Sequence, residues 1–475
     1  MNVSGSASLG TPERPLRVAV IGSGPSGFYA AGQLLSHKEI TCEVDLIERL
    51  PTPWGLVRGG VAPDHPKIKS VSRVYEKTAA REGFRFFGNV EVGTDVSHEE
   101  LTHWYDAVLY AVGTSRDKRS GIPGEDLPGS WSATEFVGWY NGHPDYRDID
   151  FDLKTERAVV VGNGNVAIDV ARMLCLAHSE LAVTDIADHA LEELDDSGVK
   201  EILVLGRRGP EQAAFTNPEV LELGELEEAD VIVDPADMEI PAELRQADLD
   251  QTAAKNIEIL EQYAQRAPSG KPKRVVLRFL ASPVEIVGTD KVEGVRIVRN
   301  ELVRSDDGSL RAGPTEVEEV IEAGLVFRAI GYTGAPLEGL PFDERRGLFP
   351  HDGAGRVTQD GEQLPQTYVA GWIKRGPSGV IGTNKKCAQE TVDSLLQDLA
   401  AGKLAAEERP SSDAVAAELL ARKPNLIEYD GWQAIDDHEK GLGEPHGRPR
   451  VKLTRIDELL EIAGDRAERR TADVG

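Results

Sequence analysis

Two glycine-rich turns, each between an apolar strand and an apolar helix, constrain the fold of this 475-residue chain most strongly. The first, Gly22-Ser23-Gly24-Pro25-Ser26-Gly27, follows the run from Leu16 to Ile21. The second, Gly162-Asn163-Gly164-Asn165-Val166-Ala167, follows the run from Ala158 to Val161. In such a turn the first glycine allows the tight bend, the second lets the backbone approach a pyrophosphate, and the third small residue lets the helix pack on the strand. The alternative is ordinary loop punctuation, because glycine-rich loops are common. We therefore predict two βαβ units that bind dinucleotides at helix N-termini.

The charges that follow the next strand differ between the two units. After the first turn, Val44 to Ile47 ends at Glu48; after the second, Ile202 to Gly206 ends at Arg207 and Arg208. A carboxylate suits a ribose hydroxyl, whereas guanidinium groups suit a 2′-phosphate. Solvated charges at strand ends are the alternative interpretation. The pattern favours FAD in the first unit, NADPH in the second, and electron transfer as the activity.

Composition limits the partners and the compartment. The net charge of −28 argues against nucleic acid and anionic membrane surfaces. No run approaches the ~18 apolar residues of a membrane span. The start, Met1 to Ser6, lacks a basic and an apolar region, so we expect a short leader, not a signal peptide, and a cytoplasmic protein.

The cysteines exclude two kinds of redox centre. Cys42, Cys175 and Cys387 are scattered and form no CxxC pair, which argues against a dithiol relay within this chain. Three thiolates are too few for a four-cysteine iron–sulfur cluster. We predict no metal site, and we expect Cys175 to be a small core residue.

Two similar strands indicate one domain inserted into another. Tyr105 to Thr114 ends in Ala-Val-Gly-Thr, and Leu325 to Gly334 carries a near echo, Ala-Ile-Gly-Tyr. We predict an α/β fold with two Rossmann-like, doubly wound domains and a cleft between them. The expected FAD-binding domain comprises residues 1–115 and 330–475, and the NADP-binding domain comprises residues 116–329. A helical excursion is expected over residues 177–199.

Two further segments have compositions typical of ligand contact. Pro51 to Pro66 is rich in proline and glycine, which predicts a rigid loop that wraps a ligand. Gly371 to Thr383 precedes a helix expected over residues 386–399, whose positive end would face an isoalloxazine carbonyl. Trp372 in this segment has interface packing as its alternative role.

One stretch is strongly acidic. Between Glu219 and Asp250 there are twelve Asp or Glu residues and one basic residue, Arg245. The pattern from Pro241 to Arg266 predicts a helix. A solvated face and a partner-facing surface both remain open as interpretations.

Four motifs in this order resemble adrenodoxin reductase and the bacterial ferredoxin–NADP reductases of that type. They are Pro53-Trp54-Gly55-Leu56-Val57-Arg58 with Gly60 to Pro66, Gly164 to Arg172, Gly206-Arg207-Arg208-Gly209-Pro210, and Gly371 to Pro377. The resemblance covers about residues 15 to 460, including the C-terminal Gly447-Arg448-Pro449-Arg450-Val451-Lys452.

The resemblance implies a role for each matching residue. It implies contacts to FAD from Gly22, Gly24, Pro25, Ser26, Gly27, Glu48, Leu56, Val57, Trp372, Gly379, Val380 and Ile381. It implies contacts to NADPH from Asn165, Val166, Arg207, Arg208 and Glu211. It also implies that His65 and Asp169 form a catalytic pair beside the flavin, on the side that faces a ferredoxin.

The resemblance also implies a two-stage reaction. A hydride passes from NADPH to FAD, and single electrons then pass to a ferredoxin, which supplies cytochrome P450 or other ferredoxin-dependent enzymes. Proton transfer by His65 is a hypothesis. A monomer is expected. Mitochondrial relatives meet their ferredoxin with basic residues where this chain is acidic, so Arg375, Lys385 and Lys386 form an alternative docking patch.

Three other functions are weighed against this one. A subunit related to glutamate synthase would need a cysteine-rich N-terminal region, and none precedes Cys42. A flavin monooxygenase would lack the Trp54 to Pro66 loop and the Trp372 motif. A non-catalytic NADPH-binding redox sensor would not turn over a one-electron acceptor.

Overall fold

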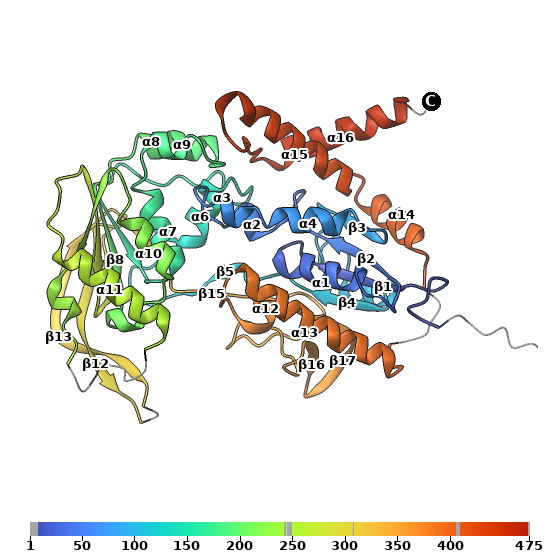
Figure 1. Ribbon diagram of the computed structural model, residues 1–475, viewed down its shortest axis with the longest axis horizontal. Coiled ribbons are helices and arrows are strands. Elements are labelled where there is room, and N and C mark those ends of the chain that lie inside the picture. The colour runs from blue at the N-terminus through green and yellow to red at the C-terminus, as the bar shows by residue number, and fades with distance from the viewer. Residues whose placement is uncertain (1–7, 242–243, 245–248, 307, 405–408, 474–475) are drawn as a thin grey trace, which may run out of the picture.

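The computed structural model describes residues 8–241, 244, 249–306, 308–404 and 409–473. The expected leader, residues 1–6, lies outside the described residues. The chain forms two lobes that lie side by side, each built around a six-stranded sheet (Figure 1).

The sheet of the first lobe holds the first glycine turn. In spatial order its strands are β16 (Arg356–Gln359), β17 (Glu362–Val369), β4 (Ala107–Tyr110), β1 (Leu16–Ile21), β2 (Cys42–Ile47) and β3 (Phe84–Phe87). All neighbours are parallel except β16, which pairs antiparallel with β17 at the edge. The central strands are buried on both faces, as near-continuous apolar runs in a parallel sheet require. Helices α1 (Pro25–Leu35) and α13 (Ile381–Ala400) pack against each other in this lobe.

The sheet of the second lobe holds the second turn and is wholly parallel. Its order is β6 (Ser130–Ser132), β14 (Leu325–Arg328), β7 (Arg157–Val161), β8 (Glu201–Leu205), β10 (Lys273–Arg278) and β9 (Ala229–Val233). The predicted α/β class with two dinucleotide-type sheets is therefore confirmed.

An antiparallel sheet in the second lobe was not predicted from the sequence. It consists of β11 (Ala281–Val287), β12 (Gly294–Arg304) and β13 (Leu310–Glu322). Its apolar face packs on β7 and β8 through residues such as Val295 and Ile297. The lobe thus has helices on one face of its parallel sheet and a second sheet on the other.

A narrow ribbon joins the lobes. Strands β5 (Arg116–Asp117) and β15 (Tyr332–Thr333) pair antiparallel between them (Figure 1). Every strand of the second sheet lies between these two strands in the sequence.

The remaining helices cover the sheets and the seam between the lobes. Those of the first lobe and the seam are α2 (Leu56–Gly59), α3 (Pro66–Lys69), α4 (Ser72–Ala79), α5 (His98–Trp104) and α12 (Trp372–Arg375). In the second lobe are α6 (Ala133–Tyr140), α7 (Asn165–Met173), α8 (His178–Leu181), α9 (Asp188–Asp195), α10 (Asn217–Leu223) and α11 (Gln251–Gln265). The C-terminal helices are α14 (Ser412–Arg422), α15 (Tyr429–Gly443) and α16 (Ile456–Asp473), of which α15 and α16 are drawn in red along the upper edge of Figure 1. The excursion predicted over residues 177–199 contains α8 and α9.

Three predicted boundaries are wrong. The helix expected over residues 386–399 begins at Ile381, five residues earlier. The helix expected from Pro241 begins at Gln251, because the Asp250 side chain caps it by accepting a hydrogen bond from the Ala253 amide at 2.8 Å; residues 242–243 and 245–248 of the expected helix lie outside the described residues. The loop from Pro51 to Pro66 contains the single helical turn α2.

Across the described part of the chain, no helix combines the length and the apolar character needed to cross a membrane.

Candidate functional site

The first glycine turn has a tight, open and packed position in succession. Gly22 has φ +100°, and a Cβ there would lie 2.7 Å from the Ala111 carbonyl oxygen. A Cβ on Gly24 would meet no atom within 4 Å, whereas one on Gly27 would lie 2.0 Å from the Gly22 oxygen. Gly24 therefore leaves room for a ligand at the start of α1. The close packing at Gly22 and Gly27 holds the turn and the helix in place.

Pro25 and Ser26 form the first turn of α1 and connect it to α13. Pro25 occupies the first helical position, where its missing amide hydrogen costs nothing. The Ser26 hydroxyl donates to Asn384 Oδ1 at 3.0 Å, and a Cβ on Gly371 would lie 2.3 Å from Ser26 Oγ. The structure thus brings the predicted turn and the predicted Gly371 segment into contact.

Glu48 is held rigidly at the carboxyl end of β2. One carboxylate oxygen accepts hydrogen bonds from the Ser23 amide at 2.9 Å and hydroxyl at 2.7 Å. The other accepts from the Leu50 amide at 3.0 Å. The oxygen that accepts from Leu50 retains a lone pair, so the carboxylate can still accept a hydrogen bond from a sugar hydroxyl.

The loop that follows lies directly on the first turn. The Trp54 amide donates to the Ser23 carbonyl at 3.0 Å. A Cβ on Gly55 would lie 2.9 Å from Gly24 Cα. Val57 is buried and Leu56 is 46% exposed, so these two predicted flavin contacts differ in their surroundings.

The Gly371 segment presents three of the predicted residues at the start of α13. Gly379 has φ +78°, Val380 is the N-cap residue and is exposed, and Ile381 is the first residue of the helix. Trp372 stacks on Tyr332 of the inter-lobe ribbon, with ring centroids 5.8 Å apart. Trp372 therefore lies at the junction of the lobes. This position fits both contact with the flavin and packing at an interface.

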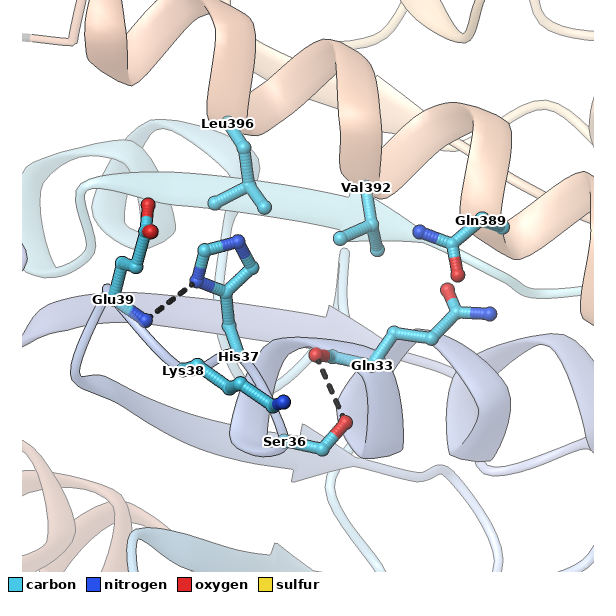
Figure 2. Close-up of a pocket in the computed structure, with 8 residues that line it drawn as sticks. All are labelled: Gln33, Ser36, His37, Lys38, Glu39, Gln389, Val392 and Leu396. Atoms are coloured by element: carbon cyan, nitrogen blue, oxygen red, sulfur yellow. Dashed lines mark hydrogen bonds between the residues drawn. The ribbon is translucent and has the colours of Figure 1, made fainter.

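A groove beside these helices lies at the wrong end of α1 for a pyrophosphate. It has a volume of about 460 Å³ and is lined by the carboxyl end of α1 and one side of α13 (Figure 2). Gln33 and Ser36 line it, eleven residues or so from the amides of the Gly24 turn. The positive end of α1 faces away from this groove.

The second glycine turn repeats the backbone geometry of the first. Gly162 has φ +124°, and a Cβ there would lie 2.3 Å from the Ala329 oxygen. A Cβ on Gly164 would meet nothing within 4 Å. Asn165 and Val166 begin α7, and the Asn165 side chain accepts from the Thr216 amide at 2.8 Å. The side-chain amide of Asn165 is therefore held by Thr216 at the start of α10. The backbone N–H of Asn165 is the group that faces a ligand at the start of α7.

Arg207 and Arg208 follow β8 with their backbones anchored and their side chains outward. Asn300 donates to the Arg207 carbonyl at 2.8 Å, and the Leu280 amide donates to the Arg208 carbonyl at 3.1 Å. Arg207 is exposed and Arg208 half-buried. Considering only described residues, neither guanidinium has an ion pair or side-chain hydrogen bond. Glu211, in the short 3₁₀ turn Pro210–Gln212, is buried instead.

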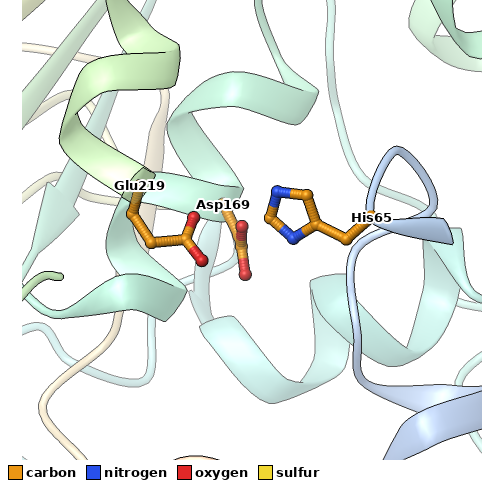
Figure 3. Close-up of side chains that lie close together, drawn as sticks. All are labelled: His65, Asp169 and Glu219. Carbon is orange, nitrogen blue, oxygen red and sulfur yellow. The ribbon is translucent and has the colours of Figure 1, made fainter. Parts of the chain in front are cut away.

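The predicted pair His65 and Asp169 meets at the seam between the lobes. His65 precedes α3, Asp169 lies on α7, and Glu219 of α10 joins them (Figure 3). One ligand atom from each of the three lies within 4.8 Å of the others. The arrangement resembles a cation site in its residue types, but a protein cation already occupies its centre.

That cation is the guanidinium of Arg172, whose side chain is 1% exposed. Its Nη1 lies 2.8 Å from Glu222, 3.1 Å from Glu219 and 3.4 Å from Asp169. Its Nη2 pairs with Asp64. His65 Nε2 lies 2.9 Å from both Arg172 Nη1 and Glu222 Oε2. It can accept from the arginine or donate to the carboxylate, but not both at once.

Four carboxylates around one arginine leave excess negative charge in a buried place. Burial, followed by the charge of Glu219, raises the pKa of Asp169 well above its usual range, although Arg172 opposes the shift. Burial likewise raises the pKa of Glu219. The cluster can therefore retain a proton that an isolated carboxylate would release at neutral pH.

Comparisons with known proteins identify the family. The chain is 51% identical over 457 residues to the NADPH-ferredoxin reductase FprA of Mycobacterium tuberculosis, covering 94% of this chain and 99% of that protein. The chain belongs to the family of adrenodoxin reductase-type NADPH–ferredoxin reductases.

Other relatives and structures agree. The mitochondrial NADPH:adrenodoxin oxidoreductase of Arabidopsis thaliana is 40% identical, covering 95% of this chain and 96% of the relative. The solved structure of Mycobacterium tuberculosis FprA in complex with NADPH superposes with a TM-score of 0.90, covering 95% of this chain and 100% of that one. A family model described as pyridine nucleotide-disulphide oxidoreductase matches residues 16–203.

Two cysteines of this member of the reductase family, Cys42 and Cys175, are held as thiols by burial. All three are free and buried. Burial raises the pKa of Cys42 and of Cys175 to about 12, so neither is a thiolate at neutral pH. Cys175 lies in the core of the second lobe, as expected from the sequence.

Sequence reasoning missed Arg172 and the acids that pair with it. Arg172 closes the motif that begins at Gly164, but the motif alone assigned it no role. The spacing of Asp169 and Arg172 places both on one side of α7 and was a usable signal. Asp64, Glu219 and Glu222 come from other elements, so only the fold brings them to Arg172.

The acidic stretch from Glu219 to Asp250 is partly structural. Glu219 and Glu222 pair with Arg172, and the fully buried Asp237 pairs with Arg299 at 2.5 Å. Asp230 accepts from the amides of the loop at 269–271. These acids face protein partners, which reduces the charge that the stretch presents outward.

Of the three residues of the alternative docking patch, one is bonded within the protein and two are exposed. Arg375 donates to Asn384 at 2.8 Å and to the Ser378 carbonyl, so it stabilises the start of α13. Lys385 and Lys386 lie in the first turns of α13 and are exposed.

Proposed function

We propose that this chain binds FAD at the first glycine turn and NADPH at the second, and reduces a ferredoxin. Bound FAD would accept a hydride from NADPH and release electrons one at a time. One observation carries the proposal: both turns have an open middle glycine, and the next strand ends in a fixed acid in one lobe and in outward arginines in the other. Membership of the NADPH–ferredoxin reductase family supports it.

The residues of the first lobe fit FAD. Gly24 leaves space at the start of α1, and Glu48 is oriented by Ser23 to accept from a ribose. The Trp54 to Val57 loop lies against the same turn, so a dinucleotide that extends from it would contact Leu56 and Val57. The amide end of α13, from Gly379 to Ile381, supplies positive dipole beside that loop.

The residues of the second lobe fit NADPH. The free backbone amides at Asn165 and Val166 would meet the pyrophosphate. Arg207 and Arg208 would hold the 2′-phosphate with paired, charge-assisted hydrogen bonds. Glu211 is a weaker assignment, because it is buried beside the arginine segment. We further propose that residues 1–115 with 330–475 form the FAD-binding domain and residues 116–329 the NADP-binding domain.

The side chains at the seam would orient the reaction and manage protons. The two lobes would hold the reacting rings in contact, and such orientation would supply most of the acceleration, since no acid or base is required. His65 and Asp169 would exchange a proton within the Arg172 cluster, because the excess carboxylate charge favours retention of one proton there.

The downstream partners follow from the same proposal. The acceptor would be a ferredoxin that supplies cytochrome P450 or other ferredoxin-dependent enzymes, and the reductase would act as a monomer. Lys385 and Lys386 are the exposed basic residues that we assign to the encounter with an acidic ferredoxin, since complementary charge mainly raises the association rate.

Anaerobic stopped-flow absorbance tests the proposal directly. The purified protein is mixed with NADPH or with NADH, and the flavin band is followed. Fast bleaching by NADPH and much slower bleaching by NADH are expected. A colourless protein, or a flavin that NADPH does not reduce, would refute the proposal.

Steady-state turnover separates the competing functions. Reduction of ferricyanide at the expense of NADPH is expected and excludes a non-catalytic sensor. NADPH oxidation that requires oxygen and hydroxylates a substrate would instead indicate a monooxygenase.

A further inference from the structure

A short C-terminal segment contacts both lobes. We call residues 448–452, Arg448-Pro449-Arg450-Val451-Lys452, the strap. It lies between α15 and α16, and in Figure 1 the turn that joins these helices lies beside α9 and α3. A Cβ on Gly443 would lie 2.7 Å from Arg450 Cα, so the strap crosses the end of α15 in close contact.

Arg448 binds the second lobe. Its guanidinium donates to the carbonyl of Thr184 at 3.0 Å and to that of Ile186, and it pairs with Asp188 at the start of α9. The side chain is 7% exposed. One end of the strap is therefore fixed to the excursion that carries α8 and α9.

Arg450 binds the first lobe through Glu439. Glu439 is fully buried on α15 and receives Arg450 at 3.1 Å and both Nη atoms of Arg58. Arg58 belongs to α2, next to Leu56 and Val57. The Arg450 guanidinium also lies 5.7 Å from the ring centroid of Trp54. The middle of the strap thus holds the loop that we assign to the flavin.

Lys452 joins the two lobes at one atom. Its Nζ donates to the Arg58 carbonyl of the flavin loop at 3.2 Å and to Asn141 Oδ1, at the end of α6, at 3.2 Å. It also lies 3.2 Å from Asp185 of the second lobe, and its side chain is 1% exposed. Arg172 also contacts this loop from the second lobe, at Asp64 and His65, so Lys452 adds a further cation that reaches the loop at Arg58.

Lys69 shares the same partners from the other side. Its Nζ lies 2.6 Å from Asp185 and 3.3 Å from Asn141. Burial lowers the pKa of Lys452 well below its usual range, and Asp185 opposes that shift. Two buried lysines therefore share the single carboxylate of Asp185. Burying the second ammonium group costs free energy, so we infer that Lys452 has a role other than stabilising the fold.

The strap supplies a further connection, beside the Arg172 cluster, between lobes that the chain joins through one ribbon. The β5–β15 ribbon contains two residue pairs, Tyr332 with Asp117 and Thr333 with Arg116. A ribbon this short acts as a hinge. A further point of attachment across the seam, at Lys452, limits rotation about the ribbon.

We propose that Lys452 is a positioning residue, which fixes the flavin loop against the second lobe so that the two bound dinucleotides meet in one geometry. The inference rests on the proposed function only for its kinetic consequence; the restraint on the lobes is independent of it. A displacement of about 1 Å between reacting groups can cost on the order of a hundredfold in rate.

The first measurement is the distance between the lobes. Spin labels are attached to Lys38→Cys in the first lobe and Lys291→Cys in the second, both exposed positions, while the native cysteines are buried. Electron–electron double resonance then compares the chain with and without Lys452→Met. We expect a narrow distance distribution with Lys452 and a broad or shifted one without it.

Lys423→Met is the matched control. Lys423 also ties the C-terminal region to a carboxylate, Asp95, at 3.0 Å, but that carboxylate belongs to the first lobe. Its loss should leave the inter-lobe distance unchanged. Lys452→Met leaves Lys69 to neutralise Asp185, so the variant should fold; far-ultraviolet circular dichroism and thermal unfolding check this. If it does not fold, Asp185→Asn, which removes the second-lobe partner of Lys452, replaces it in the same measurement.

The kinetic readout is the rate of flavin reduction by NADPH under saturating and subsaturating conditions. We expect Lys452→Met to lower the limiting rate about tenfold or more while the dissociation constant for NADPH changes less than twofold. An unchanged distance distribution and an unchanged limiting rate would overturn the proposal for Lys452. If the unmodified protein is not reduced by NADPH, the proposed function fails, yet the distance measurement still tests the strap.

Discussion

The two glycine turns share a backbone and differ in how their charged partners are held. In both, the first glycine packs against a neighbouring strand end and the middle glycine is open. In the first lobe, however, Glu48 is bonded to the turn itself and the Trp54 loop lies on top of it. In the second lobe the arginines point outward. A closed, pre-oriented site suits a cofactor that stays bound, and an open one suits a nucleotide that exchanges in each cycle.

The largest expected difference concerns the third position of each turn. Gly27→Ala places a methyl group 2.0 Å from the Gly22 backbone oxygen, so the turn or α1 must move. We expect a loss of about 3 kcal/mol in the free energy of unfolding and loss of FAD. The second turn already has alanine here, and the matched Ala167→Gly should cost about 1 kcal/mol. Urea unfolding and flavin absorbance measure both effects. Equal losses would show that the turns are packed alike.

The next largest effect should separate the nucleotides. Removing both guanidinium groups in Arg207→Ala/Arg208→Ala deletes charge-assisted hydrogen bonds, each worth about 1.5–3 kcal/mol. We expect NADPH to bind about a hundredfold more weakly and NADH to be nearly unaffected. Arg274→Ala is the control, because Arg274 lies on the neighbouring strand β10 at the amino ends of the strands, away from Arg207. Nucleotide titration of the flavin spectrum measures the dissociation constants. Equal losses for NADPH and NADH would contradict the phosphate assignment.

A smaller effect should follow from Glu48→Gln. The amide keeps the shape of the side chain but loses the charge and one of the two acceptors that Ser23 and Leu50 use. We expect FAD to bind roughly tenfold more weakly, about 1.4 kcal/mol, with NADPH affinity of the loaded enzyme unchanged. Isothermal titration of the flavin-free protein measures the first value. Glu43→Gln, at the start of the same strand, should change neither.

The fold class and both turns were predictable because they depend on local sequence. Strand, glycine turn and helix follow one another directly in each unit, and Glu48 and Arg207 come at the ends of the next strands. Packing decides the boundaries that were wrong. The start of α13 at Ile381 has no capping side chain that would mark it, and the contact of Gly371 with Ser26 comes from a distant part of the chain, so no local pattern in residues 371–386 reveals either.

The Arg172 cluster and the strap were not predictable for a related reason. Arg172 contacts Asp64 and Glu222, which are about 108 and 50 residues away in the chain. Lys452 contacts Arg58 across about 394 residues. Each residue stood in a motif, but a motif gives no partner for a side chain when the partner comes from a distant part of the chain. The antiparallel sheet β11–β13 was missed because its long exposed strand β13 is rich in glutamate.

The smallest effect that we expect compares the seam with the interior of the second lobe by their response to acid. Burial lowers the pKa of His143, which lies against Gly59 of the flavin loop, to about 4; Asp145 opposes the shift while Arg49 and Arg58 add to it. Burial also lowers the pKa of His189, which packs on Trp139 in the second lobe, to about 4. Both imidazoles are therefore neutral in the folded protein at a pH where the unfolded chain, with a pKa near 6.5, binds a proton.

Stability should accordingly be complete above pH 6.5 and fall as the pH decreases toward 4, because the unfolded state takes up protons first. Between about pH 7 and pH 5.5, we expect each imidazole to account for about 1 kcal/mol of the lost free energy of unfolding. His143→Gln and His189→Gln should each remove one such contribution, and the exposed His103→Gln should remove none. Urea unfolding at the two pH values measures the slopes. If only His143→Gln flattens the slope, the acid-sensitive group lies at the seam beside the flavin loop, and not in the interior of the second lobe.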